Sequence, residues 1–330
     1  MDSATPATPA AARPSPAAPE AEIERYRVEL TGYCYRMLGS AFEADDAVQE
    51  TMVRAWRGFD RFEGRSTLRS WLYRIATNVC LDALRGRQRR ARPVDLSPAS
   101  PADAALSTLP ENTWIEPMPD GRAVPTGDDP AEVAVARETI RLAFVAALQQ
   151  LPPRQRAVLI LREVLRWPAS DVAELLGTTV VSVNSALQRA RATLADSDGS
   201  VEAGRPMDPA QDQLLARYVD AFERYDIDAL VSLLHEDATF SMPPYALWLQ
   251  GHADIRRWYL GPGEDCRGSR VVPLRANGAP AMAQWRASGP NGSYESWAIH
   301  VLEVVDGRIS AVQHFLDPKL FPYFGLPIRP

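Results

Sequence analysis

Apolar residues in the first ninety positions recur at helical spacing. Two runs place apolar side chains at i, i+3, i+4, i+7 and i+8, which predicts two amphipathic helices. The first run consists of Leu30, Tyr33, Cys34, Met37 and Leu38, and the second of Val48, Met52, Ala55, Trp56 and Phe59. Asp45 and Asp46 precede the second run, where we expect a first turn that acidic side chains stabilise through the helix dipole. A third helix is predicted from Thr67 or Ser70 to Arg87.

Helical spacing returns between Ile140 and Leu151, stops at Pro152-Pro153 and resumes over 157–164. Two further helices, 170–176 and 180–195, follow around Gly177-Thr178-Thr179. A glycine between two short helices, with apolar positions that can face each other, predicts a helix-turn-helix. The second helix would then offer polar side chains to a DNA major groove, although a solvated helical hairpin is the alternative interpretation. These side chains belong to Ser182, Asn184, Ser185, Gln188, Arg189 and Arg191.

Beyond residue 206 the pattern changes from helical to extended. One helix is predicted around Leu214, Tyr218 and Phe222, and a short one at 227–234. Aromatic and β-branched runs then predict strands. These runs are 238–242, 270–276, 281–287, 294–305 and 308–315. Asp306-Gly307 between the last two is a strong hairpin signal. The expected architecture is helices followed by a curled antiparallel sheet.

Charge along the chain is uneven, although the total is −6. Residues 65–92 hold eight arginines against the single acid Asp82, and residues 137–195 hold eight arginines against four acids. Residues 93–136 hold eight acids against Arg122, and residues 207–330 hold fifteen acids against eleven basic residues. Nucleic acid is therefore expected to contact the first two segments and to avoid the other two.

Composition narrows the class of protein. A chain of 330 residues with 46% apolar residues is long enough for two or three domains. No apolar run is long enough to span a bilayer, so we expect a cytoplasmic protein without a membrane partner. Residues 1–22 are expected to be a disordered tail and the Pro-rich stretch 93–136 a linker. Cys34, Cys80 and Cys266 lie far apart, so neither a disulfide, a metal site nor another cofactor is predicted.

Aromatic residues lie among the arginines of the first basic segment. Phe62, Trp71 and Tyr73 could stack on unpaired bases while the arginines follow the phosphate backbone, as in single-stranded DNA binding. Taken singly, each of these residues favours a plainer interpretation, in which Trp71 is a core residue and the arginines form a solvated helix end.

These motifs together resemble extracytoplasmic-function sigma factors of RNA polymerase. Residues 23–92 resemble region 2 through Tyr35-Arg-Met-Leu-Gly, Asp45-Asp-Ala-Val-Gln-Glu-Thr and Trp71-Leu-Tyr-Arg-Ile-Ala-Thr-Asn-Val. Residues 137–196 resemble region 4 through Leu151-Pro-Pro-Arg-Gln-Arg and the helix-turn-helix. The resemblance implies two all-α domains and a transcription initiation factor. The family's Lys and Arg at the start of the recognition helix are replaced by Asn184 and Ala186, so no promoter sequence can be transferred.

The resemblance also implies partners and site residues. RNA polymerase core, through its β′ clamp and β flap, and promoter DNA are the expected partners. The acidic linker would thread through the RNA exit path. The implied polymerase-binding residues are Asp45, Asp46, Gln49, Glu50, Arg54 and Trp56. Those implied for the minus-ten element are Phe62, Gly64, Arg65, Ser66, Thr67, Trp71, Arg74, Asn78 and Asp82. Those implied for the minus-thirty-five element are Thr179, Ser182, Val183, Asn184, Ser185, Gln188, Arg189 and Arg191.

Residues 207–330 resemble SnoaL-like domains, which are α+β cones. The resemblance is carried by Tyr218-Val-Asp-Ala-Phe, Leu233-Leu-His-Glu-Asp-Ala and Gly251-His-Ala-Asp-Ile-Arg. Such cones enclose a pocket, so a small ligand of unknown identity is a candidate occupant. The candidate pocket residues are Tyr245, Trp248, His252, His300, His314 and Asp317. No acid–base pair emerges from their spacing, so no enzyme is predicted. The apolar segment after Asp317 is expected to contact the sigma regions, and the domain to regulate them.

Two other functions remain open at this level. An ordinary helix-turn-helix regulator would bind duplex operators without polymerase, usually as a dimer. A small-molecule enzyme with a DNA-binding N-terminus would need turnover that depends on His252 or Asp317.

Overall fold

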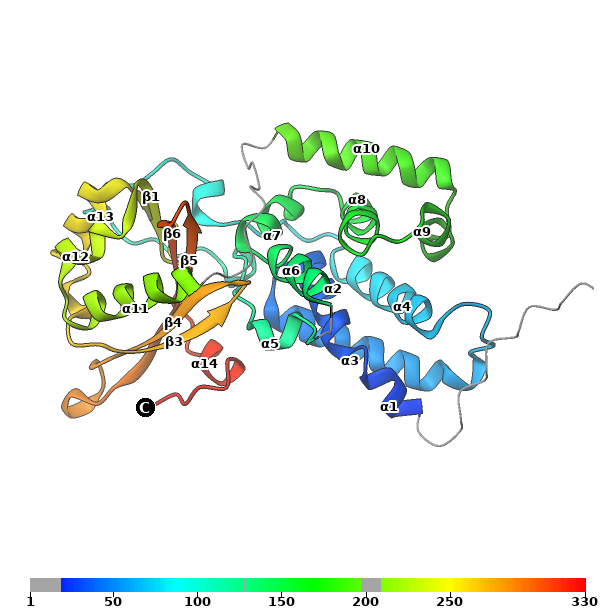
Figure 1. Cartoon of the computed structure of the whole chain (residues 1–330), viewed down its shortest axis with the longest axis horizontal. Coiled ribbons are helices and arrows are strands. Elements are labelled where there is room, and N and C mark those ends of the chain that lie inside the picture. The colour runs from blue at the N-terminus through cyan, green and yellow to red at the C-terminus, as the bar shows by residue number, and fades with distance from the viewer. Residues whose placement is uncertain (1–18, 127–128, 197–208) are drawn as a thin grey trace, which may run out of the picture.

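The computed structural model describes residues 19–126, 129–196 and 209–330, and Figure 1 shows a helical half beside a mixed α+β domain. Within these residues, no helix combines the length and the apolar character needed to cross a membrane. Helices α1 to α4 form a first bundle, residues 130–196 a second, and residues 209–330 the C-terminal domain. The predicted combination of two all-α units with an α+β domain is confirmed.

The first bundle follows the predicted apolar runs. Its helices are α1 (Pro19–Glu24), α2 (Arg27–Leu38), α3 (Ala41–Gly58) and α4 (Leu68–Ala83). Gly39 ends α2 at φ 71°, and the Ser40 side chain caps α3 by accepting a hydrogen bond from the Glu43 N–H. Because α3 begins at Ala41, Asp45 lies in its second turn, contrary to the expected first turn.

Two predicted boundaries in this bundle were wrong. The helix predicted to reach Arg87 ends at Ala83, where Leu84 forms its C-cap. The tail predicted for residues 1–22 overlaps α1 over residues 19–22, while residues 1–18 lie outside the described residues.

Residues 93–126 and 129–136 are folded, although the sequence pattern suggested that 93–136 is a separate linker. They contain helix α5 (Asp120–Ala123) and most of α6 (Pro130–Glu138), and they bury Ala102, Trp114 and Met118 almost completely. Isolated β-bridges join Ala91 to Trp114, Thr108 to Tyr245 and Pro119 to Ala276. This segment, called the linker below, therefore packs against both the first bundle and the C-terminal sheet.

The second bundle contains the predicted helix-turn-helix. Its elements are α6, α7 (Leu142–Gln149), α8 (Pro153–Leu159), a π-helical turn (Ile160–Val164), α9 (Ala169–Leu176) and α10 (Val180–Asp196). Gly177 stands at φ 60° between α9 and α10, a left-handed conformation that glycine adopts without strain.

The C-terminal domain wraps a six-stranded sheet around helices. The helices are α11 (Pro209–Glu223), α12 (Ile227–Ser232), α13 (Gly251–Tyr259) and α14 (Leu320–Tyr323). The strands are β1 (Leu234–Ser241), β2 (Trp248–Gln250), β3 (Arg270–Ala276), β4 (Ala279–Arg286), β5 (Glu295–Val305) and β6 (Arg308–Phe315). Their order is β2-β1-β6-β5-β4-β3. The expected all-antiparallel sheet was wrong, because β1 pairs with β6 in parallel, and β2 was not predicted.

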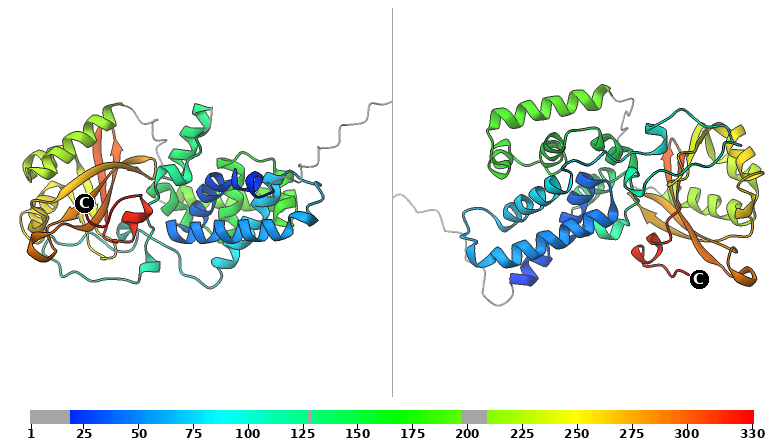
Figure 2. Two further views of the ribbon diagram at one scale, coloured as in Figure 1. Left: turned by 90° about the horizontal axis from the view of Figure 1, so that it is seen from below. Right: turned by 180° about the vertical axis from the view of Figure 1, so that it is seen from behind.

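The two faces of the sheet belong to different cores. One face carries Phe240, Met282 and Leu302 and packs against α11, α12 and α13. The opposite face carries Ala283, Val301 and other residues that join one continuous apolar cluster with both helical bundles. Figure 2 shows the sheet beside the bundles from two further directions. The helical half therefore covers this sheet face together with α14, whose Phe321 packs on Trp285 of β4.

Candidate polymerase and nucleic-acid interfaces

Helix α3 presents a polar face opposite its buried side. Ala44, Val48 and Met52 point into the bundle, whereas Asp46, Gln49, Glu50 and Arg54 are exposed. Glu50 accepts a hydrogen bond from Arg54 at 2.6 Å, and Trp56 is 56% exposed. An indole this exposed is unusual on a soluble surface and is typical of a protein-binding site. Asp45 differs from the others, because Arg122 of the linker donates to it at 2.8 Å.

The start of α4 carries an aromatic and basic surface. Thr67 caps the helix by accepting from the Ser70 N–H at 3.1 Å, and Phe62 packs on Trp71 with ring centroids 5.0 Å apart. Gly64 has φ 69°, and Arg65 is exposed beside Glu63. Ser66 is half-buried, while Asn78 and Asp82 are exposed further along. By helical spacing Trp71, Asn78 and Asp82 lie on one face of α4, with the Phe62 ring against Trp71.

Arg74 lies at a contact between the two bundles. Its guanidinium lies 3.3 Å from the Glu174 carboxylate of α9. Beneath this pair, the ring of Tyr73 packs on that of Trp167 with centroids 5.0 Å apart. The exposed ion pair contributes about 0–1 kcal/mol, so the buried aromatic contact contributes more to holding α9 against α4.

The helix-turn-helix is built as its sequence predicts. Val172 and Ala173 of α9 belong to the same apolar core as Val183, Leu187 and Ala190 of α10. Thr179 caps α10 by accepting from the Ser182 N–H at 3.2 Å. The outer side of α10 exposes Ser182, Asn184, Gln188, Arg189 and Arg191, with Ser185 half-buried. Arg191 also pairs with Glu163 at 2.6 Å.

The hairpin tip of β3 and β4, Asn277-Gly278, is buried between the two bundles and the linker. Asn277 is fully buried, and its side-chain amide donates to the Tyr35 hydroxyl and to the Ile140 carbonyl, both at 2.7 Å. Its Oδ1 accepts from the Met118 N–H at 2.9 Å, and the Gly278 N–H donates to Asp120 at 2.7 Å. The expected contact of the C-terminal domain with the helical regions is therefore present.

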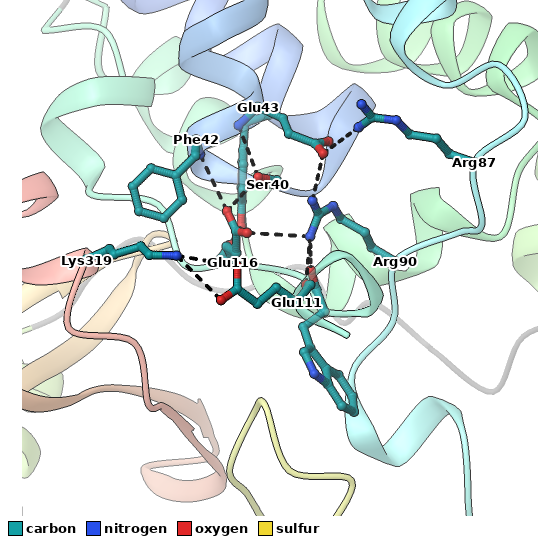
Figure 3. A network of polar contacts seen from close by, with 10 residues as sticks. Ser40, Phe42, Glu43, Arg87, Arg90, Glu111, Glu116 and Lys319 are labelled. Atoms are coloured by element: carbon teal, nitrogen blue, oxygen red, sulfur yellow. Dashed lines mark hydrogen bonds and ion pairs between the residues drawn. The ribbon is translucent and has the colours of Figure 1, made fainter. Parts of the chain in front are cut away.

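A second contact lies at the start of α3. The linker residue Glu116 accepts from the Ser40 hydroxyl at 2.6 Å and also faces Arg90 at 3.5 Å (Figure 3). Burial raises the pKa of Glu116. Lys319 lies 3.5 Å from Glu111 of the linker, and the Tyr323 hydroxyl of α14 donates to the Ala41 carbonyl at 3.2 Å.

The cone interior contains two buried histidines, and it does not unite the six candidate pocket residues. The His300 and His314 rings lie 3.9 Å apart between centroids. His300 Nε2 lies 2.8 Å from Gln284 Oε1, and the Tyr259 hydroxyl lies 3.3 Å from His314 Nε2. His314 Nδ1 faces the Ser241 carbonyl, at the end of β1.

The other four candidates lie elsewhere. His252 faces the carbonyls of Leu234 and His235, at the opposite end of β1 from the two buried histidines. Asp317 accepts from the Lys319 N–H outside the cone. Tyr245 pairs with the linker, and Trp248 donates to the Ser97 carbonyl. Trp248 also lines a cavity of about 210 Å³ between the linker and the sheet, outside the cone interior.

Three family models match the chain, and between them they cover most of it. Sigma-70 region 2 matches residues 23–90, Sigma-70 region 4 matches residues 141–194, and a SnoaL-like domain matches residues 215–312. The ECF RNA polymerase sigma factor SigG of Mycobacterium tuberculosis is 46% identical over 316 residues, which is 93% of this chain and 83% of SigG. The chain belongs to the extracytoplasmic-function sigma factors. It is therefore a transcription initiation factor that directs RNA polymerase to promoters.

A second relative has a solved structure. The sigma factor SigJ of M. tuberculosis is 28% identical over 326 residues, which is 93% of this chain and 94% of SigJ. The crystal structure of SigJ superimposes with a TM-score of 0.60 at 25% identity and covers 94% of this chain and 99% of that chain. The predicted sigma factor with a SnoaL-like extension is confirmed.

One residue assigned to the minus-thirty-five surface of this sigma factor is buried, and one exposed residue of the same helix was not assigned to it. Val183 lies on the inner side of α10, where it is fully buried and cannot touch DNA in this conformation. Val181 is 75% exposed and lies near the centre of the outward face of α10, next to Ser185 and Gln188. Val183, Leu187 and Ala190 recur at helical spacing, and this pattern could have placed Val183 on the buried side of the helix and Val181 on its exposed side.

The buried histidines make the sigma factor sensitive to acid. Burial lowers the pKa of His314 to about 3, and burial together with His314 lowers the pKa of His300 well below its usual value. An unfolded histidine has a pKa near 6.5, so between about pH 6.5 and 3 the unfolded chain binds protons that the folded chain does not. We expect the unfolding free energy to fall by about 1.4 kcal/mol per pH unit for each buried histidine as the pH drops below 6.5.

Urea unfolding of the full chain between pH 7 and 5 measures this effect. His314→Gln should reduce the pH dependence of the unfolding free energy by the contribution of one proton. His235→Gln, at an exposed position on β1, should leave it unchanged. Identical pH dependence in the wild type and His314→Gln would contradict the interpretation.

Proposed function

We propose that the C-terminal domain holds this sigma factor in a closed arrangement that must open before both promoter elements are bound. The closed arrangement is defined by the contact of α4 with α9 through Arg74–Glu174 and Tyr73–Trp167, and by the buried hairpin tip Asn277-Gly278. The minus-ten and minus-thirty-five elements are about 25 base pairs apart, or roughly 85 Å along B-DNA at 3.4 Å per base pair. Because α4 and α9 are in direct contact here, we infer that regions 2 and 4 separate before both elements are bound.

The surfaces described above supply the roles within the open state. In our proposal, Asp45, Asp46, Gln49, Glu50, Arg54 and Trp56 of α3 bind the β′ clamp, and region 4 binds the β flap. The α4 surface from Phe62 to Asp82 captures the unpaired minus-ten strand, which frees Arg74 from Glu174. The exposed side of α10 reads the minus-thirty-five element. We place the protein in the cytoplasm, where RNA polymerase acts, and infer no catalytic role for the SnoaL-like domain.

Transcription from a genomic fragment library tests the roles assigned to the open state. Purified RNA polymerase core with the full chain should yield promoter-specific run-off transcripts, and core alone should not. Duplex binding without transcripts would favour the ordinary helix-turn-helix regulator instead. Point variants of the full chain are preferable to deletion of residues 207–330, because deletion would expose the apolar cluster that the sheet shares with both bundles.

Val181 provides a sharper test of promoter reading. The first residues of a recognition helix reach base edges, and an apolar side chain there contacts the C5-methyl of thymine. We propose that Val181 contacts one thymine methyl of the minus-thirty-five element. Replacing that thymine with deoxyuridine removes only the methyl group, and we expect about fourfold weaker binding, since one buried methyl contributes about 0.8 kcal/mol.

Deoxyuridine should be placed at each thymine in turn, and duplex binding measured for two variants. Val181→Ala should abolish the difference between thymine and deoxyuridine at one position. Val180→Ala is the matched control, because Val180 is the same residue type on the neighbouring position and is 43% exposed. If the wild type tolerates deoxyuridine at every position, Val181 does not read a methyl group.

A further inference from the structure

A cavity of about 120 Å³ lies where region 2, the linker and region 4 meet. Its walls carry four guanidinium groups, from Arg87, Arg89, Arg90 and Arg156, and one carboxylate, from Glu43. Asn112 and two glutamines add amide side chains, and three leucines and Pro153 supply the apolar part of the lining. The walls thus combine a strong excess of positive charge with many hydrogen-bond donors.

Arg156 contributes a buried charge without an ionic partner. The side chain is 2% exposed, and it donates to Gln149 Oε1 at 2.6 Å and to the Leu151 carbonyl at 3.1 Å, as well as to the Met37 carbonyl. All of these acceptors are neutral, and Nε has no hydrogen-bond partner among the residues the structure describes. An unpaired buried charge is costly, so a mobile anion at this position would be stabilising.

The basic tail of region 2 supplies the other arginines. Arg90 is 7% exposed, and its Nη2 lies 3.0 Å from a Glu43 oxygen that Arg87 also contacts (Figure 3). Glu43 thus contacts two guanidinium groups, and Arg90 also lies 3.5 Å from the Glu116 carboxylate. Arg89 is exposed and has no ion pair within the described part of the chain. The uncompensated charge on this side of the cavity is therefore that of Arg89.

We propose that this cavity binds a small phosphate-type dianion, either inorganic phosphate or the terminal phosphate of a soluble ester. A tetrahedral oxyanion offers acceptors to guanidinium forks and amides at once, and arginine is the side chain best suited to such pairing. A bound anion would connect the basic tail of region 2 to α8 of region 4. It would stabilise the closed arrangement by mass action, because the cavity is formed only when the two regions and the linker meet.

Calorimetric titration of the full chain tests the site directly. Inorganic phosphate, pyrophosphate and a nucleoside triphosphate are added separately at constant ionic strength, with chloride as the reference anion. We expect one bound anion per chain, and the relative affinities of the three anions distinguish free phosphate from an ester. Saturating anion should also raise the unfolding temperature.

Two variants distinguish a specific anion-binding site from non-specific electrostatic attraction of anions. Arg89→Gln should weaken binding at least about tenfold, since it removes a charge-assisted donor. Arg85→Gln removes one charge from the same basic segment, but Arg85 does not line the cavity and is paired with Asp82, so affinity should change little. Equal weakening by both variants, or no binding beyond that of chloride, would overturn the proposal. Because the readout is binding to the free protein, either result is independent of promoter recognition.

Discussion

Gly278→Ala should raise the affinity of the full chain for RNA polymerase core by about 10- to 100-fold. A Cβ at residue 278 would lie 2.4 Å from the Arg137 carbonyl oxygen and 2.9 Å from its carbon, both backbone atoms. The hairpin tip can relieve this overlap only by withdrawing from the bundles. Overlap of this kind costs about 1–3 kcal/mol, and each 1.4 kcal/mol shifts the balance between closed and open arrangements tenfold. Titration of labelled core with each variant measures the change.

The chain offers a matched control for this experiment. Gly307 also lies in a hairpin at positive φ, 75° against 65° for Gly278, but a Cβ there would have no atom within 4 Å. Gly307→Ala therefore carries the same backbone strain without the steric wedge, and its affinity for core should match that of the wild type. If Gly278→Ala binds core no better than Gly307→Ala, the hairpin tip does not restrain the sigma regions.

Arg156→Met should lower the unfolding free energy by about 3 kcal/mol. The guanidinium satisfies carbonyls at the ends of two helices, those of Met37 in α2 and of Gln149 and Leu151 at the end of α7. Methionine fills much of the same volume but donates no hydrogen bond, so several buried acceptors lose their partner at about 1–3 kcal/mol each. Removal of the buried charge offsets part of that loss. Burial also lowers the pKa of Arg156 to about 10, which leaves the guanidinium charged at neutral pH.

Urea unfolding of the full chain measures this effect. Arg154→Met provides the comparison, because Arg154 is exposed on the same helix and the substitution changes charge and volume equally. Arg154→Met should remain within about 0.5 kcal/mol of the wild type. An Arg156→Met variant as stable as Arg154→Met would show that the cost of burying the charge equals the value of its hydrogen bonds.

Local features of the chain were predictable because local chemistry decides them. The apolar spacing around Leu30 and Val48 predicted α2 and α3, since one face of each helix must be buried. Gly177 marked the turn of the helix-turn-helix, and Asp306-Gly307 marked the β5–β6 hairpin, where Val305 pairs with Arg308. The same spacing would have separated buried Val183 from exposed Val181, although the motif by itself assigned only Val183 to DNA.

Tertiary contacts decided the rest. Trp114 and Met118 show no period, because the linker is buried by partners far away in the sequence rather than by its own repeating face. The parallel pairing of β1 with β6 joins segments about seventy residues apart. The local sequence pattern of neither strand predicts this pairing. The same is true of Asn277, which reads as an ordinary turn residue but meets Tyr35 and Ile140 from the two sigma regions.

The amino-acid sequence alone therefore determined that this protein is a sigma factor with two helical regions and a SnoaL-like extension, because its motifs are short and lie on single helices. Only the tertiary structure decided that those regions are packed together, which polar groups are buried between them and where a buried arginine lacks an ionic partner. The periodicity of apolar residues predicts whether a side chain is buried. The residue that it contacts depends on how segments distant in the sequence pack together.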